Sequence, residues 1–212
     1  MTLTEKLKSK IEQIPKAYQK FDALVDSFYQ EHLKTDKWMY HQFLEAWTHL
    51  ENTGGAYKRK KLLTALKRFI PQDSKSLLKS KADKDGCLTL YRGTGCHPFG
   101  RYEMEYAISY TDDIDKARWF AKRFLCLHKT GFVIKRKVHI NQIVAYTNDR
   151  QEKEMIIIPN KYDVYEKDSY KVIEILEYSP DSKGGEGGVK LLPANIDICE
   201  SQKYIWDIRA IS

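Results

Sequence analysis

The chain has 212 residues, of which 42% are hydrophobic and 12% aromatic, so it carries enough apolar side chains for a packed core and is not a disordered chain. The formal net charge is +7, which favours an anionic partner such as nucleic acid or an acidic protein. The four cysteines and six histidines show no metal-ligand spacing, and the sequence has neither an apolar signal core nor a run of ~20 apolar residues, so we expect a cytoplasmic protein with reduced thiols, no metal and no membrane span.

The first part of the chain has a helical period. Apolar residues recur three and four positions apart from Leu3 to about Ile70, which predicts amphipathic helices. The clearest apolar stripes lie at residues 18–28, 39–50 and 62–70. We expect Gly54 and Gly55 to end the second of these helices and Pro71 to end the third.

A short charged segment, residues 79–86, ends in glycine and is typical of a linker. Runs that favour β-strands follow it. We therefore predict an α+β protein with a helical N-terminal region, residues 1–86, followed by a β-rich region, residues 87–212.

The densest positive cluster in the chain precedes the third helical stripe. It consists of Lys58, Arg59, Lys60 and Lys61. A run of this kind is commonly a solvated helix face. It also suits a nucleic-acid backbone, because each Lys or Arg adds a salt-dependent attraction to phosphate. The cluster is therefore a candidate nucleic-acid-binding surface, with a solvated face as the alternative.

The β-rich region opens with an apolar run that ends in an arginine. Residues 87–93 predict a strand, with Arg92 and Gly93 at its end. A guanidinium is a planar fork of donors suited to phosphate oxygens, and a glycine lets the backbone come close to a ligand. The alternative is an arginine that merely extends to solvent at a strand end.

A second strand, residues 106–111, carries Ser109 and Thr111 on one face. Their hydroxyls can bind a ligand, or they can cap the turn that follows. Acidic residues at 112–115 then predict the start of a helix whose buried stripe runs to Leu125. We expect Trp119 of this helix to lie in the core.

The remaining strands are predicted from apolar runs. They lie at residues 131–140, 155–158, 170–178 and 204–211, and residues 141–146 are interpreted as a connector. The glycine-rich stretch at 183–188 lacks the Gly-Lys-Ser/Thr of a phosphate-binding loop, so we interpret it as a hairpin loop.

Two acids precede the apolar run at 155–158. Glu152 and Glu154 are two positions apart, and residues two apart in a strand point to the same side, so we expect the two carboxylates to lie side by side. Like charges at that distance repel, and a buried strand rarely holds such a pair without a use for it. The alternative is a solvated strand end.

Taken in order, these motifs resemble those of a known family. Tyr-Arg-Gly at 91–93, Ser-Tyr-Thr at 109–111 and Glu-Lys-Glu at 152–154 are similar to the three motifs of the Arg–Ser–Glu class of mono-ADP-ribosyltransferases. The helix after the second motif, and the apolar residues and proline after the third, also look like that family. The resemblance covers about residues 87–212 and implies an ADP-ribosyltransferase-like split β-sandwich.

The family binds NAD as a co-substrate and breaks the bond between nicotinamide and ribose, through an oxocarbenium-like transition state. The resemblance implies that Arg92 holds a phosphate or ribose oxygen of NAD, and that the Gly93 backbone binds the nicotinamide amide. Ser109 would contact the nicotinamide-side ribose, and Thr111 would support that strand end.

The same resemblance assigns the catalytic roles. Glu154, oriented by Ser109, would hydrogen-bond the ribose and stabilise the developing positive charge, and Glu152 would take the proton of the incoming nucleophile. The turn that includes Tyr146 and Gln151 would recognise the acceptor. No metal is implied.

The acceptor is less well determined by these motifs. In the family, Glu-x-Glu often accompanies a protein arginine, whereas the net charge and the basic cluster at 58–61 favour RNA. The size of the chain also resembles bacterial and phage-defence toxins of this class, one of which modifies messenger RNA, and such toxins imply a neutralising antitoxin as partner. RNA is slightly favoured; protein arginine is the alternative, and water as acceptor would give free ADP-ribose.

Three other classes fit parts of the sequence. A non-catalytic NAD- or nucleic-acid-binding module would keep the fold without turning over NAD. A nuclease would account for the basic residues and the acids, but no Glu-x-Lys occurs in the chain. A structural nucleic-acid binder would be insensitive to the loss of Glu154.

Overall fold

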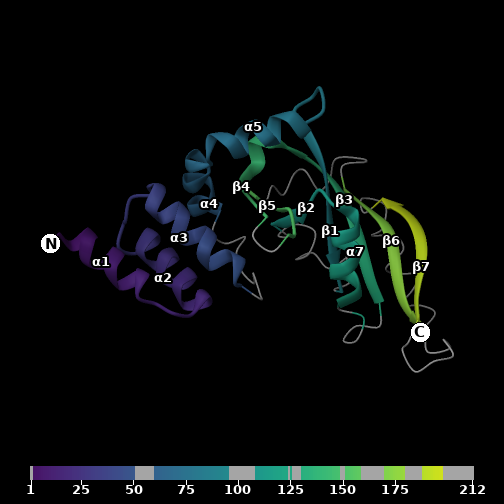
Figure 1. Ribbon diagram of the computed structural model, residues 1–212, viewed down its shortest axis with the longest axis horizontal. Coiled ribbons are helices and arrows are strands. Elements are labelled where there is room, and N and C mark those ends of the chain that lie inside the picture. The colour runs from purple at the N-terminus through teal and green to yellow at the C-terminus, as the bar shows by residue number, and fades with distance from the viewer. Residues whose placement is uncertain are drawn as a thin grey trace.

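The computed structural model describes residues 2–50, 60–95, 108–123, 125, 130–148, 151–158, 170–179 and 188–197. Within these residues, helices make up most of the first part of the chain and antiparallel strands most of the second, so the predicted α+β class is confirmed (Figure 1). None of the described helices is long and apolar enough to cross a membrane.

Helices form the N-terminal part. They are α1 (Leu3–Glu12), α2 (Ala17–Tyr29), α3 (Lys37–Thr48), α4 (Lys60–Leu66) and α5 (Gln72–Lys81), with a 3-10 turn (Lys67–Phe69) after α4. The hydroxyl of Thr2 caps α1, and the carboxylate of Asp36 caps α3 by accepting the Met39 amide at 2.9 Å. Helices α2, α3 and α4 turn an apolar stripe inward, as the period predicts.

Two helix boundaries differ from those predicted. Helix α3 ends at Thr48, well before Gly54 and Gly55, which lie outside the described residues. Helix α5 begins directly after Pro71 and continues to Lys81, so the predicted linker starts inside a helix. This helix buries Leu78 but has almost no apolar stripe, and its period is therefore hard to recognise in the sequence.

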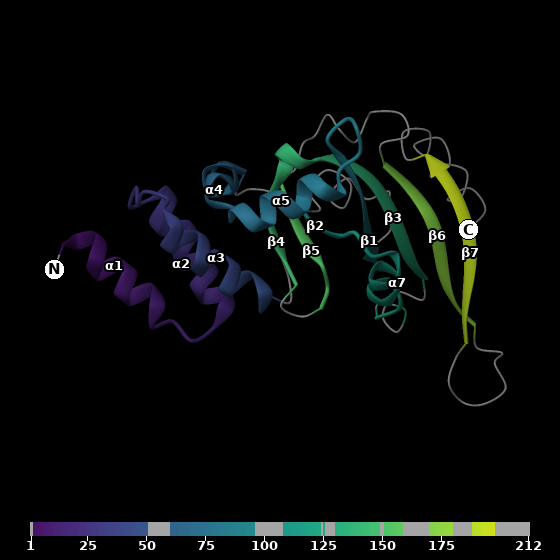
Figure 2. The same ribbon diagram turned by 45° about the horizontal axis from the view of Figure 1, so that its top comes forward.

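The described strands form one seven-stranded antiparallel sheet. They are β1 (Cys87–Thr94), β2 (Ser109–Thr111), β3 (Thr130–His139), β4 (Ile143–Thr147), β5 (Glu154–Ile157), β6 (Tyr170–Ser179) and β7 (Gly188–Asp197). Their order across the sheet is β4-β5-β2-β1-β3-β6-β7. Helix α7 (Ile114–Arg123) follows β2 and packs against β1 and β3 (Figures 1 and 2).

The strand predictions at 87–93, 131–140 and 170–178 are confirmed, and two others differ. Residues 143–147 form β4 and not a connector; their apolar run is buried on both faces and so shows no alternation. Strand β7 was not predicted, whereas the predicted last strand, residues 204–211, lies outside the described residues. Strands β6 and β7 pair along their length, from Ser179 opposite Gly188 to Lys171 opposite Asp197.

One hydrophobic core joins the N-terminal helices to the sheet. Buried side chains from both parts belong to the same cluster, among them Phe43, Trp47, Leu62, Leu90, Met155 and Ile156. Helix α4 contacts β4, and both views place α4 and α5 beside the β4–β5 edge of the sheet (Figures 1 and 2). The boundary drawn at residue 86 falls in the turn between α5 and β1, and the packed core continues across it.

Small residues let α7 lie very close to the sheet. A Cβ atom on Gly93 of β1 would be 1.9 Å from the carbonyl oxygen of Ala117, and one on Gly131 of β3 would be 2.5 Å from that of Ala121. Neither position has room for any side chain, so glycine is required at both. The distance between α7 and the sheet is thus set by two glycines of the sheet and two alanines of the helix.

Trp119 lies on the other side of this helix, and its predicted place in the core is wrong. Its side chain is 51% exposed, and the Arg123 guanidinium lies 6.0 Å from its ring. Ala117 and Ala121 occupy the buried face of α7, and a residue two positions after Ala117 points away from that face.

Tyr40 adds a polar contact to the joint between helices and sheet. Its phenol donates a hydrogen bond to the carbonyl oxygen of Val144 in β4 at 3.3 Å. Burial raises the pKa of Tyr40 to about 12. The folded state therefore holds the phenolic proton more tightly than the unfolded chain, in which a tyrosine has a pKa of about 10.

This pKa shift gives a stability change at high pH. The contribution of Tyr40 is complete below a pH of about 10 and is lost as the pH rises through about 12. When the pH is raised from about 10 to about 12, we expect the unfolding free energy of the wild type to fall by about 2–3 kcal/mol more than that of Tyr40→Phe. Urea unfolding across this range measures the difference, and parallel pH curves for the two proteins would contradict it.

The close approach of α7 predicts a second effect on stability. Gly93→Ala forces a methyl group into the backbone of α7, so we expect a loss of about 3 kcal/mol or more in unfolding free energy. Thr89→Ala, on the same face of β1 but exposed, is the matched control and should change stability by about 0.5 kcal/mol or less. Equal urea midpoints for the two variants would disprove the packing argument.

Candidate active site

The three sequence motifs lie on three neighbouring strands. Strands β1 and β2 carry the first and second motif, and β5 begins at Glu154, the last residue of the third. The three strands are adjacent in the sheet in the order β5-β2-β1. Tyr91 pairs with Thr111, and Thr111 pairs with Glu154. Directly opposed residues share a face, so these three positions lie level on one side of the sheet.

Ser109 and Glu154 are in direct contact. The Ser109 hydroxyl donates a hydrogen bond to Oε1 of Glu154 at 2.5 Å. Glu154 is 9% exposed, and no Lys, Arg or His among the described residues forms an ion pair with it. A buried carboxylate held by neutral donors alone marks a candidate functional position, because proteins usually pair such a charge.

Arg92 joins the same group through the backbone. Its Nη1 donates to the carbonyl oxygen of Ser109 at 3.0 Å. Because neighbouring residues of a strand alternate, Arg92 lies on the opposite side of β1 from Tyr91, which is the residue level with Thr111. The guanidinium therefore meets the main chain of β2 at Ser109, on the side of the sheet away from the Glu154 face.

Gly93 has a packing role in addition to its predicted one. Its Cα faces α7, where no side chain fits, and this alone requires a glycine. The predicted contact of its backbone with the nicotinamide amide stays a prediction.

Trp47 is a site residue that the sequence analysis missed. This residue of α3 is 2% exposed, and its indole Nε1 donates to Oε1 of Glu154 at 3.0 Å. In the sequence Trp47 belongs to an apolar stripe, which indicates a core position and nothing more. The N-terminal helices thus contribute a donor to the candidate catalytic carboxylate.

Glu152 lies outside strand β5, which begins only at Glu154, so the prediction that one strand aligns both acids is wrong. Its two neighbours, Gln151 and Lys153, have φ angles of 56° and 48°. These left-handed conformations are unfavourable for residues with a Cβ and commonly occur at functional turns. They break the alternation of an extended chain, so the backbone does not align Glu152 with Glu154.

Four contacts hold this strained turn. The Thr111 hydroxyl donates to the carbonyl oxygen of Glu152 at 2.9 Å, and the amide of Lys153 donates to Oδ1 of Asn148 at 3.2 Å. The amide of Gln151 donates to the carbonyl oxygen of Asn148 at 2.9 Å. The Lys153 ammonium lies 3.1 Å from Asp113, and its hydrogen bond lowers the pKa of the Asp113 carboxyl.

The residues predicted to contact the acceptor lie on different elements. Tyr146 lies in β4, paired with Met155, and not in the turn. Gln151 is exposed in the turn itself. Of the basic cluster, Lys60 and Lys61 are exposed at the start of α4, whereas Lys58 and Arg59 lie outside the described residues.

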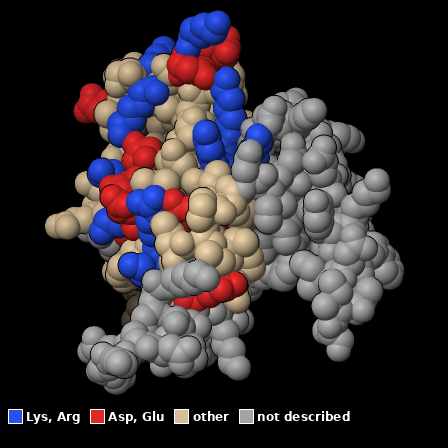
Figure 3. All heavy atoms as spheres, turned by 90° about the vertical axis from the view of Figure 1, so that its right-hand side faces the viewer, with Lys and Arg blue, Asp and Glu red and all other residues tan. Residues whose placement is uncertain are grey.

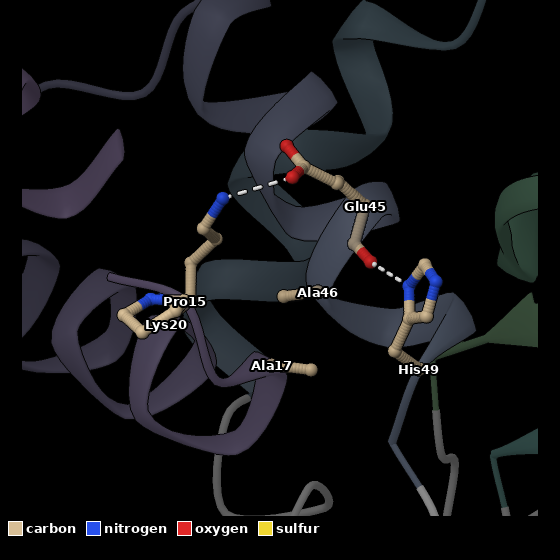
Figure 4. A pocket seen from close by; sticks show the side chains of 6 residues that line it. All are labelled: Pro15, Ala17, Lys20, Glu45, Ala46 and His49. Atoms are coloured by element: carbon tan, nitrogen blue, oxygen red, sulfur yellow. Dashed lines mark hydrogen bonds and ion pairs between the residues drawn. The ribbon is translucent and has the colours of Figure 1, made fainter. Parts of the chain in front are cut away.

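The surface charges and the hollows of the described part do not add a second candidate site. On the face in Figure 3, basic and acidic side chains are interspersed. Exposed ion pairs such as those of Lys137 with Asp83 and Asp85 also keep charges of both signs together. Figure 4 shows a hollow beside α2 and α3 in which Lys20 pairs with Glu45 at 2.9 Å. None of the candidate residues lines this hollow, and the described residues include no cluster of three potential metal ligands.

Comparison of the chain with protein-family models, with curated proteins and with solved structures finds no match. The chemistry of the site must therefore be argued from its own geometry.

The burial of the Glu154 carboxylate beside neutral donors leads to a stability prediction. Glu154→Gln keeps an oxygen for both donors and deprives no cation of a partner, so we expect its unfolding free energy to equal or exceed that of the wild type. The matched control is Glu174→Gln. Glu174 is buried to the same degree, but it accepts two hydrogen bonds from Arg118, at 2.5 and 2.8 Å.

Removal of the Glu174 charge should lower the unfolding free energy by about 1–3 kcal/mol, because the Arg118 pair is broken. Chemical unfolding of both variants at neutral pH makes the comparison. If Glu154→Gln loses as much stability as Glu174→Gln, the carboxylate has a structural role that the contacts do not reveal.

Proposed function

We propose that this protein is an NAD-dependent mono-ADP-ribosyltransferase that transfers ADP-ribose to a macromolecular acceptor. One observation carries the proposal: Ser109 donates to a buried carboxylate, Glu154, that has no cation partner among the described residues. Arg92, Ser109 and Glu154 of the motifs that resemble the Arg–Ser–Glu class also lie on adjacent strands. In this proposal the sheet corresponds to the family's split β-sandwich.

A carboxylate in this state suits the chemistry of NAD. When the bond between nicotinamide and ribose breaks, the electron pair leaves with nicotinamide and positive charge develops on the ribose. A fixed negative charge beside the ribose stabilises that transition state, and more strongly in a site of low dielectric than in water. A cation next to Glu154 would cancel the effect.

The acceptor then completes the transfer. Its nucleophilic atom forms the new bond to the ribose carbon, and its proton passes to a base, for which Glu152 in the strained turn is the candidate. The predicted contact of Arg92 with a phosphate or ribose oxygen of NAD is not part of this proposal, because alternation along β1 turns its side chain away from the Glu154 face. Thr111 holds the turn by its bond to the Glu152 carbonyl.

RNA is the acceptor that the described charges favour. Lys60 and Lys61 are exposed and make no ion pair with any described residue, so both are available for phosphates. They begin α4, which packs on β4, and β4 is the neighbour of β5. An RNA bound there would lie next to the strand that carries Glu154. An enzyme that modifies RNA in this way would be toxin-like, and a neutralising protein partner is part of the same proposal.

The test uses NAD labelled on its adenylate. The wild type and Glu154→Gln are incubated with cellular RNA and, separately, with cell protein, in the presence of a chelator. We expect the wild type to transfer label to RNA and Glu154→Gln to be at least about 100-fold slower. Label in protein would replace RNA by protein arginine as the acceptor, and free ADP-ribose alone would mean that water is the acceptor.

A charge-matched pair of variants tests the docking surface. Lys60→Gln/Lys61→Gln should reduce the labelling of RNA and weaken its salt dependence. Lys84→Gln/Lys122→Gln removes the same charge from exposed positions elsewhere and should leave labelling unchanged. If no protein turns over NAD with either acceptor, the transferase proposal fails and a non-catalytic binding module takes its place.

A further inference from the structure

The indole of Trp47 reaches the candidate catalytic carboxylate from a distant part of the chain. Trp47 and Glu154 are 107 residues apart in sequence, and the bond from Nε1 to Oε1 is 3.0 Å long. Both side chains are buried. A buried indole N–H and a buried carboxylate each need a partner, so the contact satisfies two groups at once.

An aromatic cluster fixes the position of the indole. The Trp47 ring centroid lies 5.6 Å from that of Phe43 and 6.2 Å from that of Phe21, and the two phenylalanines lie 6.1 Å apart. These rings come from α2 and α3 and belong to the core that the helices share with the sheet. Dense packing of this kind restrains the indole ring, and with it the direction of its N–H bond.

The two donors to Glu154 share one oxygen. Ser109 and Trp47 both donate to Oε1, and no described residue forms a hydrogen bond with Oε2. Together they fix the plane of the carboxylate and leave Oε2 available. Both donors are neutral, so they orient the group without neutralising its charge, as a Lys or Arg would.

We propose that Trp47 is a positioning residue of the active site, which fixes Glu154 so that Oε2 is the oxygen presented to the substrate. The inference rests on the proposed function, since the substrate in question is the ribose of NAD. It makes the N-terminal helices part of the catalytic unit and not only a surface for the acceptor. Misplacement of a catalytic group by about 1 Å can slow a reaction about 100-fold.

The first test detects the contact without any assay of activity. The indole N–H resonances of the protein are recorded by NMR, and the one missing from Trp47→Phe identifies Trp47. That resonance should be the one that shifts most in Glu154→Gln, because a neutral amide replaces the charged acceptor. A Trp47 resonance that does not move would overturn the inference.

The second test separates positioning from packing. Trp47→Phe keeps a ring in the cluster and deletes the N–H, and Tyr40→Phe deletes another buried bond from α3 to the sheet, to the carbonyl oxygen of Val144. If Trp47 positions Glu154, Trp47→Phe lowers kcat for NAD consumption by about 10-fold to 100-fold with little change in KM. Tyr40→Phe should stay within about 2-fold of the wild-type rate.

Where Trp47→Phe fails to fold, benzothienylalanine at position 47 keeps the shape of the indole and replaces only its N–H by sulfur. A wild-type kcat in a folded protein that lacks this N–H would overturn the inference and leave the proposed function intact. A wild type that turns over no NAD with any acceptor would overturn the proposed function, and the positioning role with it.

Discussion

The buried charge of Glu154 is the feature on which the rest of the site depends. Its only hydrogen bonds with described residues come from an indole on a helix and a hydroxyl on a neighbouring strand, and no cation in the described part of the chain forms an ion pair with it. Such a charge is expensive to bury and adds little to stability. It can persist because the two layers that supply its donors are joined by one hydrophobic core, which fixes the donors independently of the carboxylate.

Much of the framework could be read from the sequence. The helical period of residues 3–70 and the apolar runs that became β1, β3, β5 and β6 fixed the α+β class and most element positions. The predicted strands also placed Arg92, Ser109 and Glu154 on strands or directly beside them, although they did not reveal that β2 lies between β1 and β5. Sheet order is a long-range property, and local patterning carries little information about it.

The failures have local physical causes. The prediction for Glu152 assumed the alternation of a strand. It failed because Gln151 and Lys153 adopt left-handed conformations, which their side chains do not favour and the sequence therefore does not indicate. Trp119 was expected in the core, but the helix approaches the sheet through alanines and leaves no room for a ring on that face. The contact of Trp47 was invisible because a tryptophan in an apolar stripe has the same sequence signature whether or not its N–H has a partner.

The shared core also has a consequence for synthesis on the ribosome. Helix α3 packs against α2, but part of the core it belongs to comes from strands that follow it by about a hundred residues, and Glu154 itself emerges 107 residues after Trp47. At the usual elongation rate of about 5–20 residues per second, the helices wait roughly 5–20 s for the strands that bury them. During that interval the nascent chain displays phenylalanine and tryptophan side chains, so its yield in the cell should depend on factors that shield apolar surface during translation.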